Sequence, residues 1–102
     1  MLFRSAVNAA TTFAKAKIAG TGSDLALSLD YATKDEGAYP IVLVTYEIVC
    51  SKGNDAAKLA LLKGFLTYTS SADGQKALSD LGYAPLPESV RSKVASSVGN
   101  LA

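Results

Sequence analysis

Apolar residues recur along the first part of the chain at a spacing typical of a helix. Between Ser5 and Ile18 they fall near one helical face, at Val7, Ala10, Ala14 and Ile18. The hydroxyl of Ser5 suits a helix start, because it can accept a hydrogen bond from a free backbone N–H. The segment Ala19–Gly22 then holds two glycines, which disfavour helix and permit a turn. We predict an amphipathic helix over Ser5–Ile18 that ends at this turn.

Two later segments show the period of two that is expected of strands. Over Leu25–Tyr31, leucine and tyrosine alternate with small or polar residues, which predicts a strand with one covered face. Ala32–Pro40 is charged, contains glycine and ends in proline, as a loop does. Ile41–Cys50 is rich in Val, Ile and Tyr and carries apolar residues on both faces. We predict a central strand here, buried on both sides.

The remainder of the chain has the pattern of helices. An apolar stripe predicts a helix over Asp55–Thr69, and Ser70 with Asp73 resembles a capping box for a second helix that stops at Gly82. A rigid corner, Tyr83–Pro87, leads into a last helix. The residues that form the apolar stripes of these helices are Leu59, Leu62, Phe65, Leu66, Ala77, Leu78, Leu81, Val90, Val94, Val98 and Leu101. This order predicts an α/β fold, a few-stranded sheet covered by helices.

Composition narrows the class of protein. With 49% hydrophobic and 19% charged residues, the 102-residue chain has the character of a soluble globular protein. Its length suits one domain or a piece of one, so we treat residues 1–102 as a single partial domain. Ten Lys and Arg against nine Asp and Glu leave a net charge of +1 without a run of like charges. This balance argues against a nucleic-acid partner.

The residue types that carry most catalytic chemistry are scarce. The chain has no histidine, the commonest general base and metal ligand, and its single cysteine is Cys50. One cysteine cannot build a zinc site or an internal disulfide. We therefore expect no catalytic residue, no metal-binding residue and no cofactor, and predict that the protein is not an enzyme.

The start of the chain is unusual. Met1–Ser5 reads like the translation of a sequencing adapter, which suggests an artificial start on a truncated gene. No basic stretch followed by an apolar one stands there, so we expect no secretion signal in this chain. No run reaches the eighteen or so apolar residues of a membrane span.

Several residues invite a functional interpretation, and each also has a structural one that we favour. The segment Gly20–Ser23 could form an anion-binding nest, but a strand rather than a helix follows it, so we expect a plain turn. Glu47 could be a buried carboxylate with a raised pKa, yet a solvated or ion-paired glutamate is the better interpretation. Cys50 could be a reactive thiol, but it shares a face with apolar residues and is expected to be buried.

Aromatic residues can be interpreted in the same two ways. Tyr39 before Pro40 could line a cleft or precede a cis peptide bond, and we expect it to pack at a crossover instead. Phe65, Tyr68 and Tyr83 could form a stacking platform, but no basic residues are interleaved with them. We predict that these three aromatic residues pack in the core.

Two stretches resemble a known family. They are AYPIVLVTYEIVCSK, from Ala38 to Lys52, and LGYAPLPESVRSKV, from Leu81 to Val94, separated by a helical region ending in SADGQKAL. Together they are similar to the tail of the phosphate-specific substrate-binding proteins of ABC importers, especially actinobacterial ones. The resemblance covers nearly everything from Ala19 onward. The matching residues are Tyr39, Pro40, Ile41, Gly74, Gln75, Tyr83, Pro85, Leu86 and Pro87.

The resemblance implies a fold, a function and a location. The fold would be the C-terminal part of a type II periplasmic-binding-protein fold, a few strands packed with about four to five helices. The parent protein would be secreted or lipid-anchored, would close two lobes on inorganic phosphate and would deliver it to a membrane permease. Glu36–Ile41 would then be a plausible hinge between lobes.

The resemblance also implies where the phosphate is not bound. The family's ligand contacts come from earlier parts of the sequence, and none of those motifs aligns with a residue here. We therefore expect no phosphate-binding residue in this fragment, and no phosphate binding by the fragment alone.

Two alternatives stay open at this point. The chain could be a free-standing helical interaction domain, if Val90, Val94, Val98 and Leu101 faced outward. It could also belong to a binding protein for another oxyanion, such as sulfate or molybdate.

Overall fold

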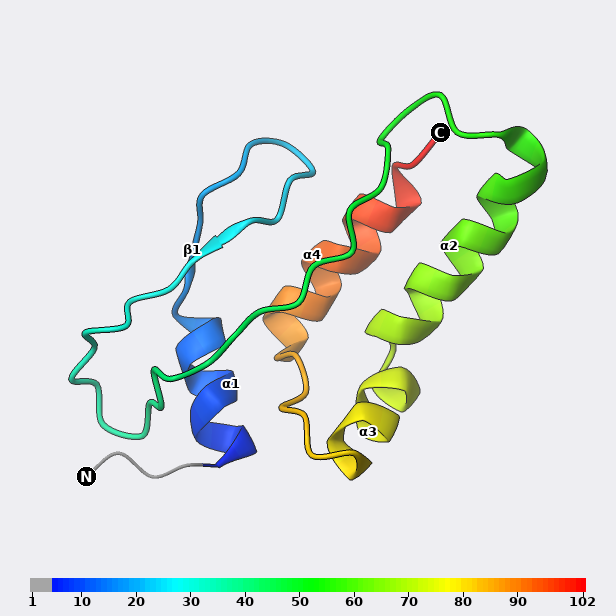
Figure 1. The fold of residues 1–102 in the computed structure, drawn as a ribbon. Coiled ribbons are helices and arrows are strands. Elements are labelled where there is room, and N and C mark those ends of the chain that lie inside the picture. Colours follow the sequence, from blue (N-terminus) through cyan, green and yellow to red (C-terminus); the bar gives the residue numbers. More distant parts are fainter. Residues whose placement is uncertain (1–4) are drawn as a thin grey trace.

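Four helices and one short antiparallel sheet form the computed structural model, which describes residues 5–102. In chain order the elements are α1 (Ala6–Ala14), β1 (Lys17–Ile18), β2 (Leu27–Ser28), α2 (Ala56–Ser70), α3 (Ala72–Asp80) and α4 (Glu88–Gly99). Lys17 pairs with Ser28 and Ile18 with Leu27. α2 and α4 lie side by side, and α1 with its hairpin lies on the other side of α4 (Figure 1).

Side-chain caps fix the starts of three helices. The Ser5 hydroxyl accepts from the Asn8 N–H at 3.1 Å, and the Asp55 carboxylate accepts from the Ala57 N–H at 2.9 Å, so the predicted starts of α1 and α2 are confirmed. Of the suspected artificial start, Met1–Arg4 lie outside the described residues. The predicted cap of α3 is wrong by one residue, because Ser71 rather than Ser70 accepts from the Gly74 N–H. The Ser70 hydroxyl instead donates back to the Leu66 carbonyl.

The end of α3 follows the prediction. Gly82 has a φ of +91°, a backbone conformation that residues with a Cβ rarely adopt. Its N–H donates to the Ser79 carbonyl at 3.0 Å, and the Tyr83 N–H donates to the Leu78 carbonyl at 3.1 Å. These two bonds form a Schellman motif, which satisfies carbonyls that the helix leaves free.

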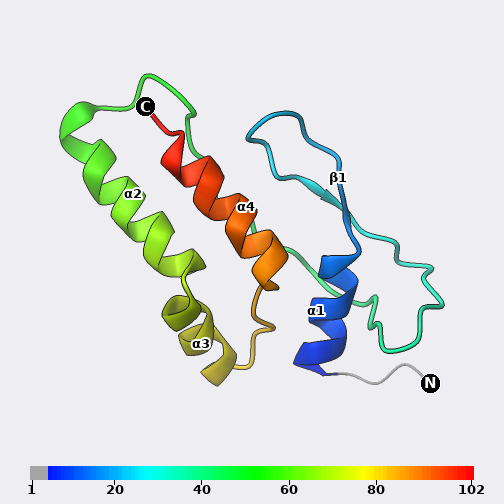
Figure 2. The same cartoon turned by 180° about the vertical axis from the view of Figure 1, so that it is seen from behind.

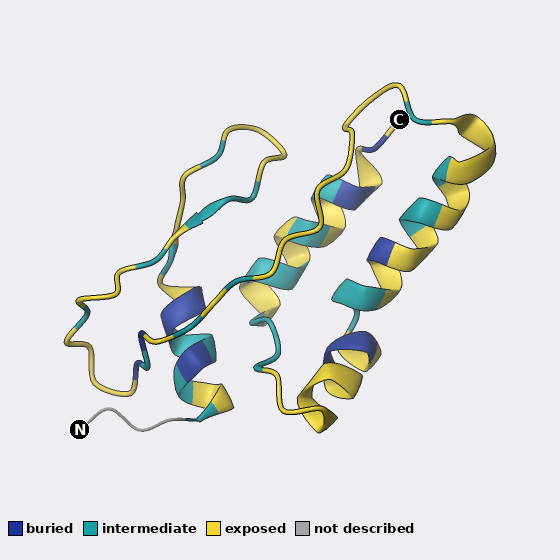
Figure 3. Ribbon diagram, in the orientation of Figure 1, coloured by how far each residue is buried: buried dark blue, intermediate teal, exposed yellow. Residues whose placement is uncertain are grey.

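The main core lies between α2 and α4. Its buried members are Leu66, Val98 and Leu101, and the half-buried Leu59, Leu62 and Val94 pack against them. In Figure 3, buried and half-buried segments lie on the facing sides of α2 and α4. The predicted stripe of the last helix therefore faces inward. An outward-facing stripe, the feature that favoured a free-standing interaction domain, is not formed.

The buried face of α1 differs from the prediction. The helix ends at Ala14 rather than Ile18, its buried residues are Ala9, Thr12 and Phe13, and Val7 is exposed. Thr12 can be buried because its hydroxyl donates to the Tyr39 carbonyl at 2.9 Å. The Tyr39 N–H in turn donates to the Asn8 carbonyl at 3.1 Å. Docking of Tyr39 therefore selects a face that the apolar spacing did not indicate.

The strand predictions fare worse than the helix predictions. Of Leu25–Tyr31, only Leu27–Ser28 forms a strand. Ile41–Cys50 forms none, and the prediction that it is buried on both faces is wrong, since Leu43 is 89% and Ile48 is 93% exposed. A strand needs a partner for its backbone groups, and the described part of the chain offers this segment none.

The described chain is thin. Its extents are 50 × 30 × 17 Å, and its radius of gyration is 14.8 Å, against about 13 Å for a compact domain of this size. Figure 2, from behind, shows α2 and α3 forming one edge of the molecule. Phe65, Tyr68 and Tyr83 are more than half exposed, so the prediction that they pack in the core is wrong. α2 has apolar residues on two sides, and only one side finds a partner.

Candidate functional site

Gln75, in the helical region between the two stretches that carry the family resemblance, is bonded to the second of them. Its side chain is 7% exposed. The Gln75 amide nitrogen donates to the Thr69 carbonyl at 2.8 Å, and its amide oxygen accepts from the Leu86 N–H at 2.7 Å. The end of α2, the start of α3 and the proline-rich corner are therefore held by one side chain. Sequence reasoning noticed Gln75 only as a matching residue and missed this role.

Gly74 is required by the same arrangement. A Cβ on this residue would lie 2.1 Å from the Tyr68 carbonyl oxygen and 3.1 Å from that of Thr69. Both are backbone atoms at the end of α2, and they cannot move without moving the helix. The Gly74–Gln75 pair therefore serves packing: glycine allows the close approach and glutamine satisfies the polar groups.

Both stretches line a shallow pocket of about 280 Å³. Tyr39 and Ile41 come from the first stretch, and Gly82 and Ala84 from the second. The start of α1 closes the pocket with Ser5, whose hydroxyl already caps the helix. The remaining lining residues are Ala6, Ala9 and Val42. Of these lining residues, Ser5 and Tyr39 have polar side chains, and two hydroxyls do not form a charged set of donors for an anion.

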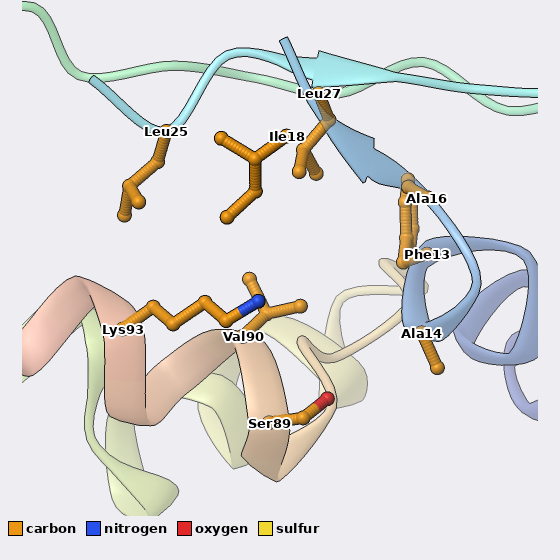
Figure 4. Close-up of a pocket in the computed structure, with 9 residues that line it drawn as sticks. All are labelled: Phe13, Ala14, Ala16, Ile18, Leu25, Leu27, Ser89, Val90 and Lys93. Carbon is orange, nitrogen blue, oxygen red and sulfur yellow. The ribbon is translucent and has the colours of Figure 1, made fainter. Parts of the chain in front are cut away.

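A smaller pocket of about 80 Å³ lies between the hairpin and α4 (Figure 4). Apolar side chains from α1 and the hairpin face Val90, and the polar contributors are Ser89 and Lys93. Recognition of an oxyanion needs several donors that converge on one point, as at a helix N-terminus or in a nest. One hydroxyl and one ammonium among apolar groups do not provide that arrangement.

The acidic residues and the thiol do not form a site either. Lys15 donates to Asp35 at 2.8 Å, and this hydrogen bond and the lysine charge lower the pKa of the Asp35 carboxyl. Glu47 is solvated, in agreement with the structural interpretation. Cys50 is free and exposed, so the prediction of a buried cysteine is wrong; its segment lacks the cover that burial requires. Within residues 5–102 no cluster of acidic, cysteine or histidine residues could hold a metal ion.

The remaining candidates behave as structural elements. Gly20–Ser23 forms the turn of the β1–β2 hairpin, where the Asp24 N–H donates to the Thr21 carbonyl and Gly22 has a φ of +61°. Tyr39 and Pro40 are joined by a trans peptide bond. Asn54, which sequence reasoning missed, donates through its side chain to the carbonyls of Cys50 and Ala102.

No helix in the described part of the chain has the length and apolar character needed to cross a bilayer.

Comparison with known proteins finds similarity to phosphate-binding proteins. It is 46% identical over 93 residues to the phosphate-binding protein PstS 3 of Mycobacterium tuberculosis (strain ATCC 25618 / H37Rv), and 43% identical over the same length to that of Mycobacterium leprae. It is 44% identical over 89 residues to PstS 2 of Mycobacterium tuberculosis. The first match covers 89% of this chain and 25% of the relative. The chain thus spans about a quarter of the length of these relatives.

Two further comparisons give no match. No family model matches the sequence, and no solved structure matches the fold. The names of the relatives describe a binding role and no catalytic one, in agreement with the prediction that the protein is not an enzyme. Over 89% of its length, the chain is homologous to the mycobacterial phosphate-binding proteins, the family whose tail its two stretches resemble.

Proposed function

We propose that this chain is the C-terminal part of the substrate-binding component of an ABC importer for inorganic phosphate. The observation that carries the proposal is the 46% identity over 93 residues to a phosphate-binding protein. The hydrogen bond between Gln75 and Leu86 supports it, because it joins two of the residues that match the family. In the parent protein, phosphate would be the ligand, a membrane permease the partner, and the outer face of the membrane the location.

The part of the fold that this chain supplies is a scaffold for one lobe of a type II periplasmic-binding-protein fold. The two pockets described above, most of whose lining residues are apolar, support the view that the phosphate contacts lie elsewhere in the parent. Within this scaffold, Glu36–Ile41 remains the proposed hinge. Gly37 has a φ of +77°, a conformation that glycine adopts easily, whereas the Tyr39 N–H is hydrogen-bonded to α1.

The test is phosphate binding by a chimera. In the PstS 3 relative of Mycobacterium tuberculosis, the matched stretch is replaced by the aligned part of this chain, which is 89% of its length. Titration calorimetry with inorganic phosphate compares the chimera, the relative and this chain alone. We expect the chimera to bind within about tenfold of the relative, a difference below about 1.4 kcal/mol, and the chain alone not to bind.

Sulfate and molybdate titrations of the same chimera address the alternative of another oxyanion. A folded chimera without phosphate affinity would contradict the proposal, and so would phosphate binding by this chain alone.

A further inference from the structure

Most of the backbone of Ile41–Cys50 has no hydrogen-bonding partner in the described part of the chain. The Val42 N–H donates to the Pro40 carbonyl at 2.9 Å, and within residues 5–102 no backbone hydrogen bond joins residues 43–49 to any other residue. The segment runs as an extended trace from the region of α1 to the loop before α2 (Figure 1). A row of free N–H and C=O groups on an extended segment is a template for pairing with another strand.

The side chains of this segment are covered on one side only, and only in its first half. Val42 and Val44 are half-buried, whereas their neighbours Ile41 and Leu43 are 73% and 89% exposed. Farther along, the Tyr46 hydroxyl accepts from the Leu27 N–H at 2.9 Å, and Ile48 is almost fully exposed. Exposed large apolar side chains two residues apart, such as Ile41 and Leu43, are typical of an interface.

We propose that Ile41–Cys50 is a sheet strand whose hydrogen-bonding partners are strands from the rest of a longer protein. This inference rests on the proposed function, under which the chain is part of such a protein. The relatives supply the occupant, since the chain covers only 25% of their length and the described part is a layer 17 Å thin. Strands added at both edges and cover over Ile41 and Leu43 would complete the sheet that the apolar pattern predicts.

A second copy of this chain fits the segment less well. If two copies paired this segment antiparallel, their twofold axis would be perpendicular to the plane of the two strands. The folded parts of both copies would then lie against the same face of the pair, with the strands only about 4.8 Å apart. The half-buried Val42 and Val44 show that the folded part of each copy already lies against that face. Two such bodies would compete for the same space.

Hydrogen–deuterium exchange of the chimera described above tests the proposal. We expect the amides of residues 43–49 to exchange at least about a hundredfold more slowly in the chimera than in this chain alone. Unslowed exchange in a folded chimera that binds phosphate would overturn the inference and leave the proposed function standing. Slow exchange in a chimera that fails to bind phosphate would support the inference and contradict the proposed function. Slow exchange in this chain alone, with the mass of a dimer in sedimentation, would overturn it in favour of a second copy.

A substitution at Leu43 gives an independent readout. Because Leu43 is 89% exposed in this chain, Leu43→Lys should leave the urea midpoint of the chain unchanged. In the chimera the same charge would be buried, so the midpoint should fall clearly. Leu43→Ile keeps an apolar, strand-forming side chain and should leave both midpoints close to their starting values. Equal midpoints for the chimera and its lysine variant would overturn the inference.

Discussion

The helical part of the molecule, residues 55–102, and the extended part, residues 17–54, differ in where their backbone bonds are made. In the helical part, α2, α3 and α4 satisfy their own backbone groups, and Ser71 and Asp55 cap two of their starts. In the extended part the sheet consists of one two-residue pair, and most of Ile41–Cys50 is unpaired. A helix closes its bonds within one segment, whereas a strand depends on another.

This difference shows which part of the chain can form its structure from its own residues. The core of the helical part, Leu66, Val98 and Leu101, is formed by residues of this chain alone. Several large apolar residues of the extended part are instead exposed, among them Tyr31, Ile41, Leu43 and Ile48. Substitutions in the helical part should therefore change the stability of the isolated chain much more than substitutions in the extended part.

The largest effect is expected at the contact between α2 and α3. In Gly74→Ala, the new Cβ would meet the Tyr68 carbonyl oxygen at 2.1 Å, so the two helices must separate. We expect a loss of about 3 kcal/mol in the free energy of unfolding, the upper range for overpacking. Urea denaturation followed by circular dichroism measures it.

Gly64→Ala is the matched control for this substitution. Gly64 lies inside α2 with no atom near its missing Cβ, so alanine there should stabilise the helix by about 0.5–1 kcal/mol. Equal effects of the two alanines would mean that the close approach of α2 and α3 is not what Gly74 provides.

A smaller loss is expected when the Gln75 bridge is removed. Gln75→Leu keeps an apolar side chain of similar size but leaves the Thr69 carbonyl and the Leu86 N–H without their partner. An unsatisfied group of this kind costs about 1–3 kcal/mol. Thermal denaturation of Gln75→Leu beside Lys76→Leu, at an exposed neighbouring position, measures the cost of the bridge. A melting temperature as high as that of the Lys76 variant would show that the corner is held by other contacts.

The sequence predicts the helices well because the signals that specify a helix, like its hydrogen bonds, are local. Asp55 at the start of α2 and Gly82 after α3 act on residues within a turn or two, so the signal and its effect are close in sequence. The cap of α3 was predicted one residue early because Ser70 and Ser71 are both suitable. Only geometry decides that Ser70 bonds back to Leu66.

The errors lie where distant segments decide the outcome. The buried face of α1 is selected by Tyr39, 27 residues beyond Thr12, and no local spacing reports that contact. The strand prediction for Ile41–Cys50 describes what the residues favour, and the described chain lacks the partners that would let them form it. For the site, the sequence indicated that no metal or catalytic cluster should be expected. It could not indicate that the Gly74–Gln75 pair bridges α2 and the corner.

The smallest effect is expected in the extended part, at the ion pair between Lys15 and Asp35. The hydrogen bond and the charge of Lys15 lower the pKa of Asp35 in the folded chain, so the pair stabilises the fold above the unfolded pKa of the carboxyl. That contribution is lost as the pH falls through the lower, folded pKa. Both side chains are half exposed, so solvent and salt screen the pair.

Lys15→Gln should therefore lower the melting temperature slightly at pH 7, and the difference from the parent chain should vanish once the pH lies well below about 4. Lys34→Gln removes the same charge from an exposed neighbour of Asp35 that has no ion pair in the described part of the chain, and it should change the melting temperature less. A Lys15 effect that persisted at low pH could not arise from Asp35. It would indicate that the aliphatic stem of Lys15, rather than its charge, links the end of α1 to the loop that leads to Tyr39.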